Sequence, residues 1–547
     1  MAREPVAPKQ LIRIDPAEWR WAVGWSVGAL LLTSLPYLYG ALLSTPQSQF
    51  SGLVLGVEDG NSYLARIRLG ASGAWQLHLF YTSEPHPGAY LMPFYLVLGK
   101  LARLVNSEPV VAFHAARLAC GLLLLLSVYC FAAFFTAARA VRRLTLWLVG
   151  LGSGLGWLVL LTGQLAQVGL PLDFYSPEAF AFHALLGLPH VSLALSSLLW
   201  GIVLAGMAWE QQNLRYAFWA GLALTVTALA GAFYIGIAAA VLGSGLVLRA
   251  IRRRSTAFVV AELRVVALAL MMPALIVAYN VYVFTGHPVY QVWAAQNQIL
   301  SPRPLHYVLS FGPLLVLAVL GGYQEWRRNA SRSLLLIGWC LVLPLLAYFP
   351  FALQRRMTLG GQVALTILAG LALWRSDEVT AAQGQRHGWV RRLGRPALIA
   401  LLSISNLIIL VGMVQEVSRQ SPPVFIPDWQ VAAAEWLGQH ATTEQVVLAS
   451  YSTGNYLPTR MPARVFLGHD VETVHAVDKQ AMVHRFYSSE DEAFRRKMLA
   501  AYNINYVYYG PHERALGSFI PAQAPYLKLV YDNTIVQIYR VVLEENP

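Results

Sequence analysis

The chain has 547 residues, of which 56% are apolar and 12% are charged, and its mean hydropathy is +0.50. Soluble domains of this length are far more polar, so the composition excludes an ordinary soluble enzyme and indicates that lipid surrounds much of the chain. The formal net charge of +12 is spread over short clusters between apolar runs, which argues against a nucleic-acid partner.

Long apolar runs recur along the chain, and a helix needs about 18 or more such residues to cross a bilayer. They predict an α-helical polytopic membrane protein with about eleven transmembrane helices. In the segment 216–249, the pair Ala230-Gly231 either separates two short helices or interrupts one long tilted helix. The predicted helices begin near Trp21, Val110, Leu144, His190, Tyr216, Gly231, Ala257, Tyr307, Ser333, Gly360 and Pro396.

The arginine clusters predict the orientation, because short cytoplasmic loops of membrane proteins collect Lys and Arg. With the N-terminus in the cytoplasm, the clusters at 139–143, 249–254, 327–332 and 386–395 all fall on the cytoplasmic side. An odd number of spans then places everything after Val414 on the extracytoplasmic side.

The last part of the chain alternates helical segments with short strands, which predicts a small α/β domain. We place the transmembrane domain at residues 1–415 and the extracytoplasmic α/β domain at 416–547. Predicted helices cover 428–439 and 489–502, and predicted strands cover 446–450, 465–467, 504–508, 526–531 and 534–541.

The first outer loop, residues 44–109, is long and carries amphipathic helical segments at 61–69 and 88–104, which we expect to lie along the membrane surface. A transporter has little need of such a shelf, whereas an enzyme that works at the interface does.

Two adjacent carboxylates, Glu58 and Asp59, open the segment VEDGNSYLARIRLGASG of this loop. Helical spacing puts Asp59, Tyr63 and Arg66 on roughly one face, where a general base or a metal ligand could be built. The alternative is that Asp59 caps a helix that starts near Asn61.

Further along the same loop, the segment YTSEPHPGAY holds Glu84 and His86 in a proline-rich turn. The prolines would fix these side chains beside the shelf helices, so both are candidates for substrate binding. The alternative is a solvated turn that binds no ligand.

The second long outer loop, residues 164–190, combines carboxylates with imidazoles: Asp173, Glu178, His183 and His190. These groups could complete a divalent metal site, although their spacing matches no specific metal motif. Helix capping and interfacial polarity are the alternative explanation.

Arg355 and Arg356 follow an outward-going span, against the trend of the other arginines. Guanidinium groups suit phosphate geometrically, so the pair predicts a phosphate site. The phosphate could belong to a substrate or to an anionic lipid headgroup.

The segments EDGNSYLA, YTSEPHPG, Pro189-His190 and PFALQRRMTLGG, set in this architecture, resemble the polytopic glycosyltransferases of the GT-C fold. That superfamily includes protein O-mannosyltransferases, lipid A aminoarabinose transferase and the oligosaccharyltransferase catalytic subunit. The resemblance covers most of the chain and is nearest to bacterial members, which implies a bacterial plasma (inner) membrane. The sequence departs from the superfamily in having no DXD triplet and no WWDYG-type motif.

The resemblance implies transfer of a sugar from a polyprenyl-phosphate-linked donor to an acceptor hydroxyl on the outer face of the membrane, with inversion. Asp59 would be the catalytic carboxylate and Glu58 its acidic neighbour. The implied partners are the lipid-linked sugar, membrane lipid and a glycan, lipid or protein acceptor, and a divalent metal (Mg or Mn) is a candidate cofactor. The other candidates are Arg355, Arg356, Glu84, His86, Tyr63 and His190 for substrate or phosphate binding, and Asp59, Asp173 and Glu178 for metal binding.

Two other functions stay open. A transporter or flippase would carry ionisable residues near span centres and an internal repeat, but Glu262 and Arg264 lie near one end of a span and no repeat is evident. A non-catalytic membrane subunit would bind a partner through the tail, where polar residues surround Gly468. That cluster, His469, Asp470, Glu472 and His475, could equally be a solvated loop.

Overall fold

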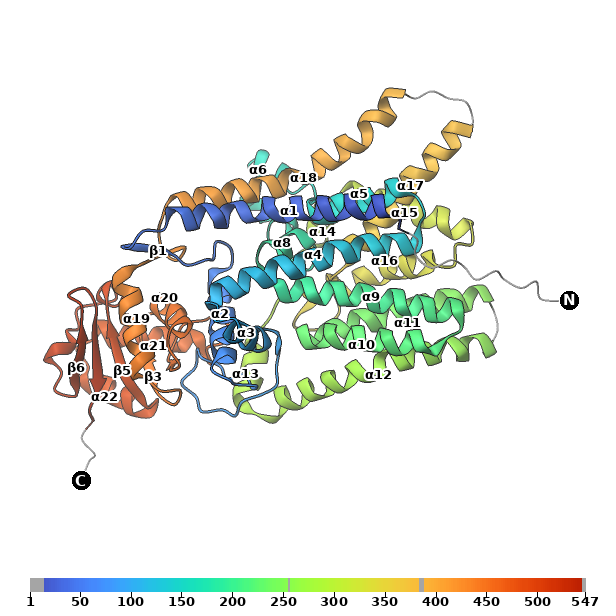
Figure 1. Cartoon of the computed structure of the whole chain (residues 1–547). Coiled ribbons are helices and arrows are strands. Elements are labelled where there is room, and N and C mark those ends of the chain that lie inside the picture. Colours follow the sequence, from blue (N-terminus) through green and yellow to red (C-terminus); the bar gives the residue numbers. More distant parts are fainter. Residues whose placement is uncertain (1–13, 254–255, 383–387, 544–547) are drawn as a thin grey trace. The chain divides into compact units, whose positions relative to one another are not determined.

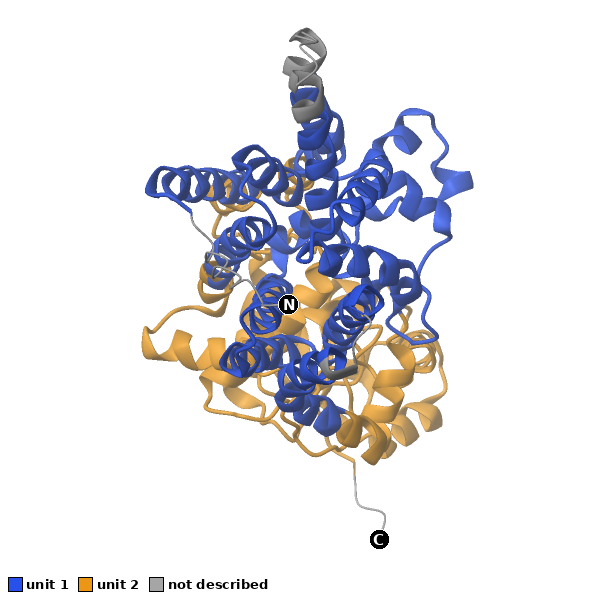
Figure 2. Cartoon of the chain, turned by 90° about the vertical axis from the view of Figure 1, so that its right-hand side faces the viewer, with its two compact units in different colours: residues 1–35, 116–280, 299–412 blue, residues 36–115, 281–298, 413–547 orange. Residues whose placement is uncertain are grey.

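The computed structural model describes residues 14–253, 256–382 and 388–543 (Figure 1). The chain forms two compact units, shown in Figure 2. Unit 1 comprises residues 1–35, 116–280 and 299–412, and unit 2 comprises residues 36–115, 281–298 and 413–547. Arg254 and Arg386, which belong to two of the arginine clusters, lie outside the described residues.

Unit 1 is helical. Its helices are α1 (Pro16–Leu43), α4 (Pro109–Phe135), α5 (Arg139–Gly150), α6 (Trp157–Leu161), α7 (Leu165–Val168), α8 (Ala181–Gly187), α9 (Pro189–Gln211), α10 (Leu214–Ala230), α11 (Ile235–Arg253), α12 (Thr256–Gly286), α14 (Pro304–Phe311), α15 (Pro313–Arg327), α16 (Ser333–Ala347), α17 (Gly361–Ala382) and α18 (Gly388–Ser418), with short 3-10 turns η1 (Leu172–Phe174), η2 (Ala232–Tyr234) and η3 (Gln354–Thr358). The apolar core of the unit is built largely by α4, α9, α10, α11, α16 and α17. The helices α1, α4, α12 and α18 continue into residues of unit 2.

Among the described residues, 7 helices are long and apolar enough to cross a membrane, or up to 8 if the bent pair α14 and α15 is one span. Two shorter apolar helices, α10 and α16, fall below that length. The chain is therefore mostly helical with several membrane-crossing candidates, while the predicted count of eleven is not confirmed.

The span predicted from Leu144 is wrong, because α5 ends at Gly150 after 12 residues, about 18 Å of helix. The glycine-rich segment that follows makes backbone contacts that a side chain would block. A Cβ on Gly154 would lie 1.7 Å from the carbonyl oxygen of Ser310. At the other uncertain place, Ala230-Gly231 separates two helices, since Gly231 is extended with φ −173 and η2 then leads into α11.

Unit 2 joins three stretches of chain: residues 36–115, a short middle segment at 281–298 and the C-terminal residues from 413. The predicted division at residue 415 stays a prediction, since it follows the chain and these units follow contacts. The elements are β1 (Ser48–Phe50), α2 (Val57–Ala71), α3 (Phe94–Leu104), α13 (Pro288–Gln296), β2 (Phe425–Pro427), α19 (Asp428–His440), β3 (Val446–Leu448), α20 (Tyr451–Tyr456), η4 (Leu457–Thr459), β4 (Arg464–Val465), α21 (Ala476–Ser488), α22 (Glu492–Ala501), β5 (Ile504–Tyr509), α23 (Pro511–Arg514), η5 (Pro521–Gln523), β6 (Leu527–Asp532) and β7 (Gln537–Val541).

The C-terminal sheet has the strand order β4-β3-β5-β7-β6. Strand β3 pairs in parallel with both β4 and β5, and β7 is antiparallel to β5 and β6. The small C-terminal sheet domain predicted from the alternation of helices and strands is thus confirmed. Helices α20 and α21 were not among the predicted elements. A second, two-stranded ribbon pairs β1 with β2, so the segment 44–109 hydrogen-bonds directly to the start of the C-terminal region.

Helices α2 and α3 cross at two glycines. A Cβ on Gly70 would lie 2.1 Å from the carbonyl oxygen of Leu96, and a Cβ on Gly99 would lie 1.9 Å from that of Ile67. Near this crossing, the rings of Tyr63 and Tyr95 stack with centroids 4.5 Å apart. The close crossing therefore fixes the position of α2, which carries Glu58 and Asp59.

We expect Gly99→Ala to destabilise the protein by roughly 1–3 kcal/mol, because the added methyl group must push α3 away from the α2 backbone. The change should outweigh the gain in helix propensity of about 1 kcal/mol. Thermal unfolding of the purified full chain measures it. The control is Gly243→Ala on α11, where a Cβ would meet no described heavy atom within 4 Å, and which should unfold at or slightly above the parent temperature. Equal unfolding temperatures for the two variants would contradict the close crossing.

Candidate active site

The two adjacent carboxylates lie in the first turn of α2. The helix begins at Val57, after Gly56 in the left-handed conformation with φ 57. Asp59 is therefore inside the helix and is not its capping residue, so the capping interpretation is wrong. Negative side chains in a first turn are favoured by the helix dipole. The side chain of Asp59 is 62% exposed, and that of Glu58 is 39% exposed.

Two loops of the sheet domain face these carboxylates. One loop leaves the carboxyl end of β3 and leads to Tyr451, and the other leaves β4 and carries His469 and Asp470. Since β4 and β5 lie on opposite sides of β3, the strand order reverses there. In open α/β sheets, ligand sites form outside the carboxyl ends of the strands at such a reversal.

His469 lies at the centre of the cluster, and its side chain is only 4% exposed. Its Nε2 is 3.4 Å from Asp59 Oδ1, and its Nδ1 is 3.2 Å from Asp470 Oδ1 and 3.7 Å from Glu58 Oε1. Glu58 also accepts hydrogen bonds from the Tyr451 hydroxyl and, at 3.0 Å, from the backbone N–H of Asp470. The first loop and the tail thus build one site.

The surrounding carboxylates favour a charged imidazole ring. Burial by itself lowers the pKa of His469, but the adjacent carboxylates of Asp470, Asp59 and Glu472 raise it overall to about 10. The backbone N–H groups of Val471 and Glu472, 3.2 and 3.3 Å from Nδ1, would favour a neutral ring. Three nearby acidic groups outweigh these two dipoles, so the pKa is raised. The hydrogen bond with His469 in turn lowers the pKa of Asp470.

The loop of His469 is held in place by a chain of amides. The Asn455 side chain donates to Gly468 O at 2.8 Å and accepts from Asn61 Nδ2 at 2.7 Å. Gly454 and Gly468 lie in direct backbone contact here. A side chain would not fit, because a Cβ on Gly454 would lie 1.9 Å from the carbonyl oxygen of Leu467. Asn61 of α2 is therefore tied to the loop that presents His469.

A buried ion pair fixes the same loop one helical turn further along α2. Arg66 Nη2 and Ser62 Oγ donate to Glu472 Oε1 at 2.7 and 2.6 Å, and all three side chains are buried. The interpretation of the region around Gly468 as a solvated loop is therefore wrong. The side chains of Asp59 and Arg66 face neighbouring residues of this loop, while Tyr63 stacks on Tyr95 of α3.

Glu84 and His86 lie in unit 2 but have partners in the protein. Glu84 forms an ion pair with the buried Lys479, Nζ to Oε2 2.6 Å. His86 accepts from the N–H of Leu79 at 2.9 Å through Nε2, while Nδ1 lies 2.8 Å from the Glu84 carbonyl. Burial lowers the pKa of His86 to about 4, so its ring is neutral and donates through Nδ1. Both ring nitrogens are engaged, and His86 positions the turn.

Gln296, in the middle segment of unit 2, supports the site although no motif in the sequence predicted this. Its Nε2 donates to Thr473 O at 2.7 Å and Val471 O at 3.2 Å, and its Oε1 accepts from His475 N at 2.8 Å. An amide that satisfies three backbone groups of one loop fixes that loop's conformation. Gln296 therefore supports the segment that follows His469.

Asp173, a candidate metal ligand, lies in unit 1 and is fully buried. Its carboxylate accepts from Ser405 Oγ at 2.8 Å, Ser310 Oγ at 3.1 Å and the N–H groups of Gly156 and Gly154 at 3.1 and 3.2 Å. Burial raises its pKa. These four hydrogen bonds occupy the carboxylate oxygens. Asp173 therefore stabilises the glycine-rich turn.

Arg355 and Arg356 lie on η3 in unit 1, and His190 is the second residue of α9 in the same unit. Arg356 Nε is 3.6 Å from Glu178 Oε1. Glu178, a candidate metal ligand, therefore forms an ion pair with Arg356 instead. The guanidinium of Arg355 lies over Tyr175, 4.8 Å from the ring centroid. Its buried Nε has no hydrogen-bond partner among the described residues. Arg356 thus pairs with a carboxylate, while Arg355 packs on an aromatic ring.

The cluster on α2 offers two kinds of chemistry. An exposed carboxylate beside a buried imidazole can accept a proton from a hydroxyl group. In addition, Glu58, His469 and Asp470 each offer a ligand atom within 4.8 Å of the others, which is a set that could hold a metal ion. A cation at this set would have to displace the imidazole proton, because only the neutral ring binds metal.

The chain combines a helical body that holds several membrane-crossing candidates, two carboxylates at the start of α2 and a small C-terminal sheet domain. The chain is similar to the apo crystal structure of the oligosaccharyltransferase of Archaeoglobus fulgidus, with 13% identity and a TM-score of 0.55 over 97% of this chain and 76% of that chain. The same fold resemblance extends to AglB of that organism in complex with an inhibitory peptide and a dolichol-phosphate (TM-score 0.52, 13% identity, 97% and 75% covered).

A third similar structure is the A. fulgidus enzyme in complex with Zn and sulfate (TM-score 0.50, 14% identity, 93% and 73% covered). No protein-family model and no curated protein matches the chain. At these identities the comparisons establish the fold. The predicted resemblance is therefore confirmed at the level of the fold, and the solved structures that share this fold are oligosaccharyltransferases.

We expect Glu472→Gln to destabilise the protein by about 3 kcal/mol, because it leaves the charge of Arg66 buried without a counter-ion. Thermal unfolding of the full chain measures the effect. Glu492→Gln is the matched control, since Glu492 forms a 3.0 Å ion pair with Arg496 on an exposed helix face. Such pairs contribute less than about 1 kcal/mol, so the control should unfold near the parent temperature. A Glu472→Gln protein as stable as the control would show that the pair does not hold α2.

Proposed function

We propose that the protein transfers a sugar from a polyprenyl-phosphate-linked donor to an acceptor hydroxyl at the outer face of a bacterial plasma membrane. The observation that carries the proposal is the cluster in which an exposed Asp59 adjoins the buried His469 and Glu58 at the start of α2. The fold supports it, because the similar solved structures are glycosyltransferases and one holds a dolichol-phosphate.

In the proposed reaction Asp59 is the base. The acceptor oxygen attacks the anomeric carbon while its proton passes to the Asp59 carboxylate, and the bond between that carbon and the phosphate oxygen breaks. The polyprenyl phosphate leaves with the electron pair, so no acid is needed for the leaving group. A single displacement inverts the anomeric centre. His469 holds Asp59 in place and offsets the charge of its neighbours.

The donor phosphate is proposed to bind at Arg355 and Arg356. The Nε group of Arg355 is a buried donor without a partner among the described residues, and a buried N–H without an acceptor costs about 1–3 kcal/mol. A phosphate oxygen would supply that acceptor. Two adjacent guanidiniums, with Glu178 3.6 Å from Arg356, suit a phosphate group geometrically and electrostatically.

A divalent cation is proposed at Glu58, His469 and Asp470, and because an imidazole joins two carboxylates there, the set suits Mn²⁺ better than Mg²⁺. When bound, such a cation would supply Lewis-acid stabilisation of developing negative charge. The ligand set differs from the one expected from Asp59, Asp173 and Glu178, since the latter two have partners in unit 1.

The transporter alternative gains no support from the apolar helices. Glu262 accepts two hydrogen bonds from Arg249, Nε to Oε2 and Nη2 to Oε1, both 2.5 Å. Both residues are buried. A carboxylate held by a bidentate arginine is a structural pair and not a site that takes up and releases a substrate ion.

We expect Asp59→Asn to lower the rate of sugar transfer by roughly 10²–10⁴-fold, because the amide cannot accept the acceptor's proton. Transfer from a synthetic polyprenyl-phosphate sugar, with the protein in lipid nanodiscs, measures the rate. Asp478→Asn, on an exposed face of α21, is the matched control and should keep the parent rate. The assignment of Asp59 fails if both variants keep full activity and the parent transfers sugar. If the parent transfers no sugar from any polyprenyl-phosphate donor, the proposed function itself fails.

Arg355→Gln should raise the KM for the lipid donor about tenfold or more, since a hydrogen bond between charged groups contributes about 1.5–3 kcal/mol. The same variant should weaken binding of polyprenyl phosphate alone, which is measured without turnover. Arg303→Gln removes another exposed arginine of unit 1 and is expected to change neither value. Unchanged binding of polyprenyl phosphate to Arg355→Gln would place the phosphate elsewhere.

A further inference from the structure

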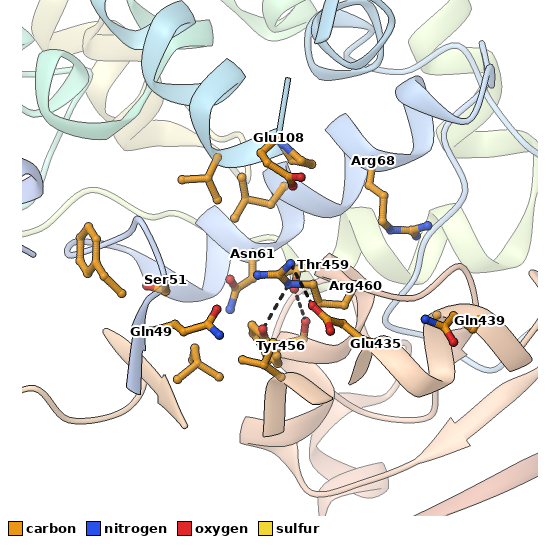
Figure 3. Close-up of a pocket in the computed structure, with 17 residues that line it drawn as sticks. Gln49, Ser51, Asn61, Arg68, Glu108, Glu435, Gln439, Tyr456, Thr459 and Arg460 are labelled. Carbon is orange, nitrogen blue, oxygen red and sulfur yellow. Dashed lines mark hydrogen bonds and ion pairs between the residues drawn. The ribbon is translucent and has the colours of Figure 1, made fainter. Parts of the chain in front are cut away.

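A cavity of about 430 Å³ lies along α2 in unit 2, and we name it the α2 pocket (Figure 3). Its volume falls within the roughly 300–1,000 Å³ of ordinary small-ligand sites. In Figure 3, Glu108 points in from above, Arg460, Tyr456 and Glu435 lie together below it, and Gln49 lies to the left. Amide, hydroxyl, carboxylate and guanidinium groups therefore converge on one space.

The α2 pocket adjoins the carboxylate cluster. Asn61, Leu64 and Arg68 line it from one face of α2, spaced three and four residues apart. A second cavity of about 290 Å³ shares Asn61, Ile426 and Tyr456 with the α2 pocket, and Glu58 is among the residues that line it. The two cavities therefore adjoin, and the second one brings Glu58 of the carboxylate cluster next to the α2 pocket.

The charges in the α2 pocket balance. Two guanidiniums, Arg68 and Arg460, face two carboxylates, Glu108 and Glu435. A phosphate or carboxylate ligand would meet both negative side chains, so the pocket has no net attraction for an anion. A hydroxyl group, in contrast, donates to a carboxylate and accepts from a guanidinium at the same time.

The polar groups of the α2 pocket also keep hydrogen-bonding capacity for a ligand. Arg68 donates through Nε to Pro458 O at 3.1 Å, while its Nη2 has no hydrogen-bond partner in the described part of the chain. Arg460 Nη1 is 3.7 Å from Glu435 Oε1, which is beyond hydrogen-bonding distance. A ligand hydroxyl placed between Arg460 and Glu435 could bond to both.

We propose that the α2 pocket binds an uncharged, hydroxyl-rich acceptor, a neutral oligosaccharide whose reactive end lies in the adjoining cavity that Glu58 lines. This inference rests on the proposed function, and it names the acceptor class. A lipid acceptor would need a predominantly apolar lining. A peptide would be recognised by a row of backbone hydrogen bonds with apolar side-chain pockets, whereas here the polar groups come from side chains of both charges.

The test measures binding to the full chain in lipid nanodiscs. The probes are neutral trisaccharide methyl glycosides of several configurations, the corresponding uronates and a peptide rich in serine and threonine, each followed by saturation-transfer NMR. We expect a neutral glycoside to bind at millimolar concentration or below, and Arg460→Gln and Glu435→Gln each to weaken that binding about tenfold. The two substitutions should leave the unfolding temperature unchanged, because both side chains are partly solvent-exposed.

A second exposed ion pair of the same type provides matched controls. The side chains of Arg496 and Glu492 are 42% and 55% exposed, against 37% and 54% for Arg460 and Glu435. Arg496→Gln and Glu492→Gln should therefore leave glycoside binding unchanged. The proposal is overturned if no neutral glycoside binds, if the uronates or the peptide bind and respond to the pocket variants instead, or if pocket and control variants behave alike.

The release of polyprenyl phosphate from the lipid-linked sugar, in the same preparations, separates the two proposals. If the parent protein releases polyprenyl phosphate but glycoside binding ignores the pocket variants, the acceptor assignment fails and the proposed function stands. If the parent binds the neutral glycoside in the α2 pocket but never releases polyprenyl phosphate from any donor, the pocket stands as a glycan site and the proposed function fails.

Discussion

The docking of α2 on two loops of the C-terminal sheet is the constraint on which the site depends. Three consecutive turns of the helix take part: Glu58 meets Tyr451, Ser62 and Arg66 share Glu472, and Asn61 is bonded to Asn455. Because Arg66 and Glu472 are both buried, neither charge can lose the other without a large desolvation cost. This pair therefore holds the helix in one register, and the register decides which residues Glu58 and Asp59 meet.

The consequence is that a single imidazole sets the electrostatics of the cluster. Glu58, Asp59 and Asp470 all approach His469, and three neighbouring carboxylates repel one another unless a positive charge lies among them. A protonated ring supplies that charge, and so would a divalent cation in its place. Asp59 stays the most accessible of the acidic groups on α2, which suits a group that must meet an incoming hydroxyl.

The residues proposed to bind the donor phosphate and the residues proposed to activate the acceptor belong to different units. Arg355 and Arg356 lie on η3 of unit 1, with Glu178 beside Arg356, whereas Glu58 and Asp59 on α2 and Asp470 surround one imidazole in unit 2. The fold resemblance gives the architecture, but a fold does not by itself imply a reaction. The argument for glycosyl transfer comes from the side chains at these two places, and that for a glycan acceptor from the balanced charges of the α2 pocket.

Local sequence determined the membrane character of the chain, the helices and strands of its tail and the acidic start of α2, because periodicity and composition act over short distances. Even there the helix bounds differed from the prediction. Helix α2 begins at Val57, directly after Gly56, so that Asp59 lies inside it. Helix α5 ends at Gly150, before a glycine-rich segment, where hydropathy alone predicts that the helix continues. Only the tertiary structure decided the partners of Glu58 and Asp59. Some four hundred residues separate them from His469, and such a contact leaves no pattern in either segment, since it arises from the packing of α2 against the loops after β3 and β4.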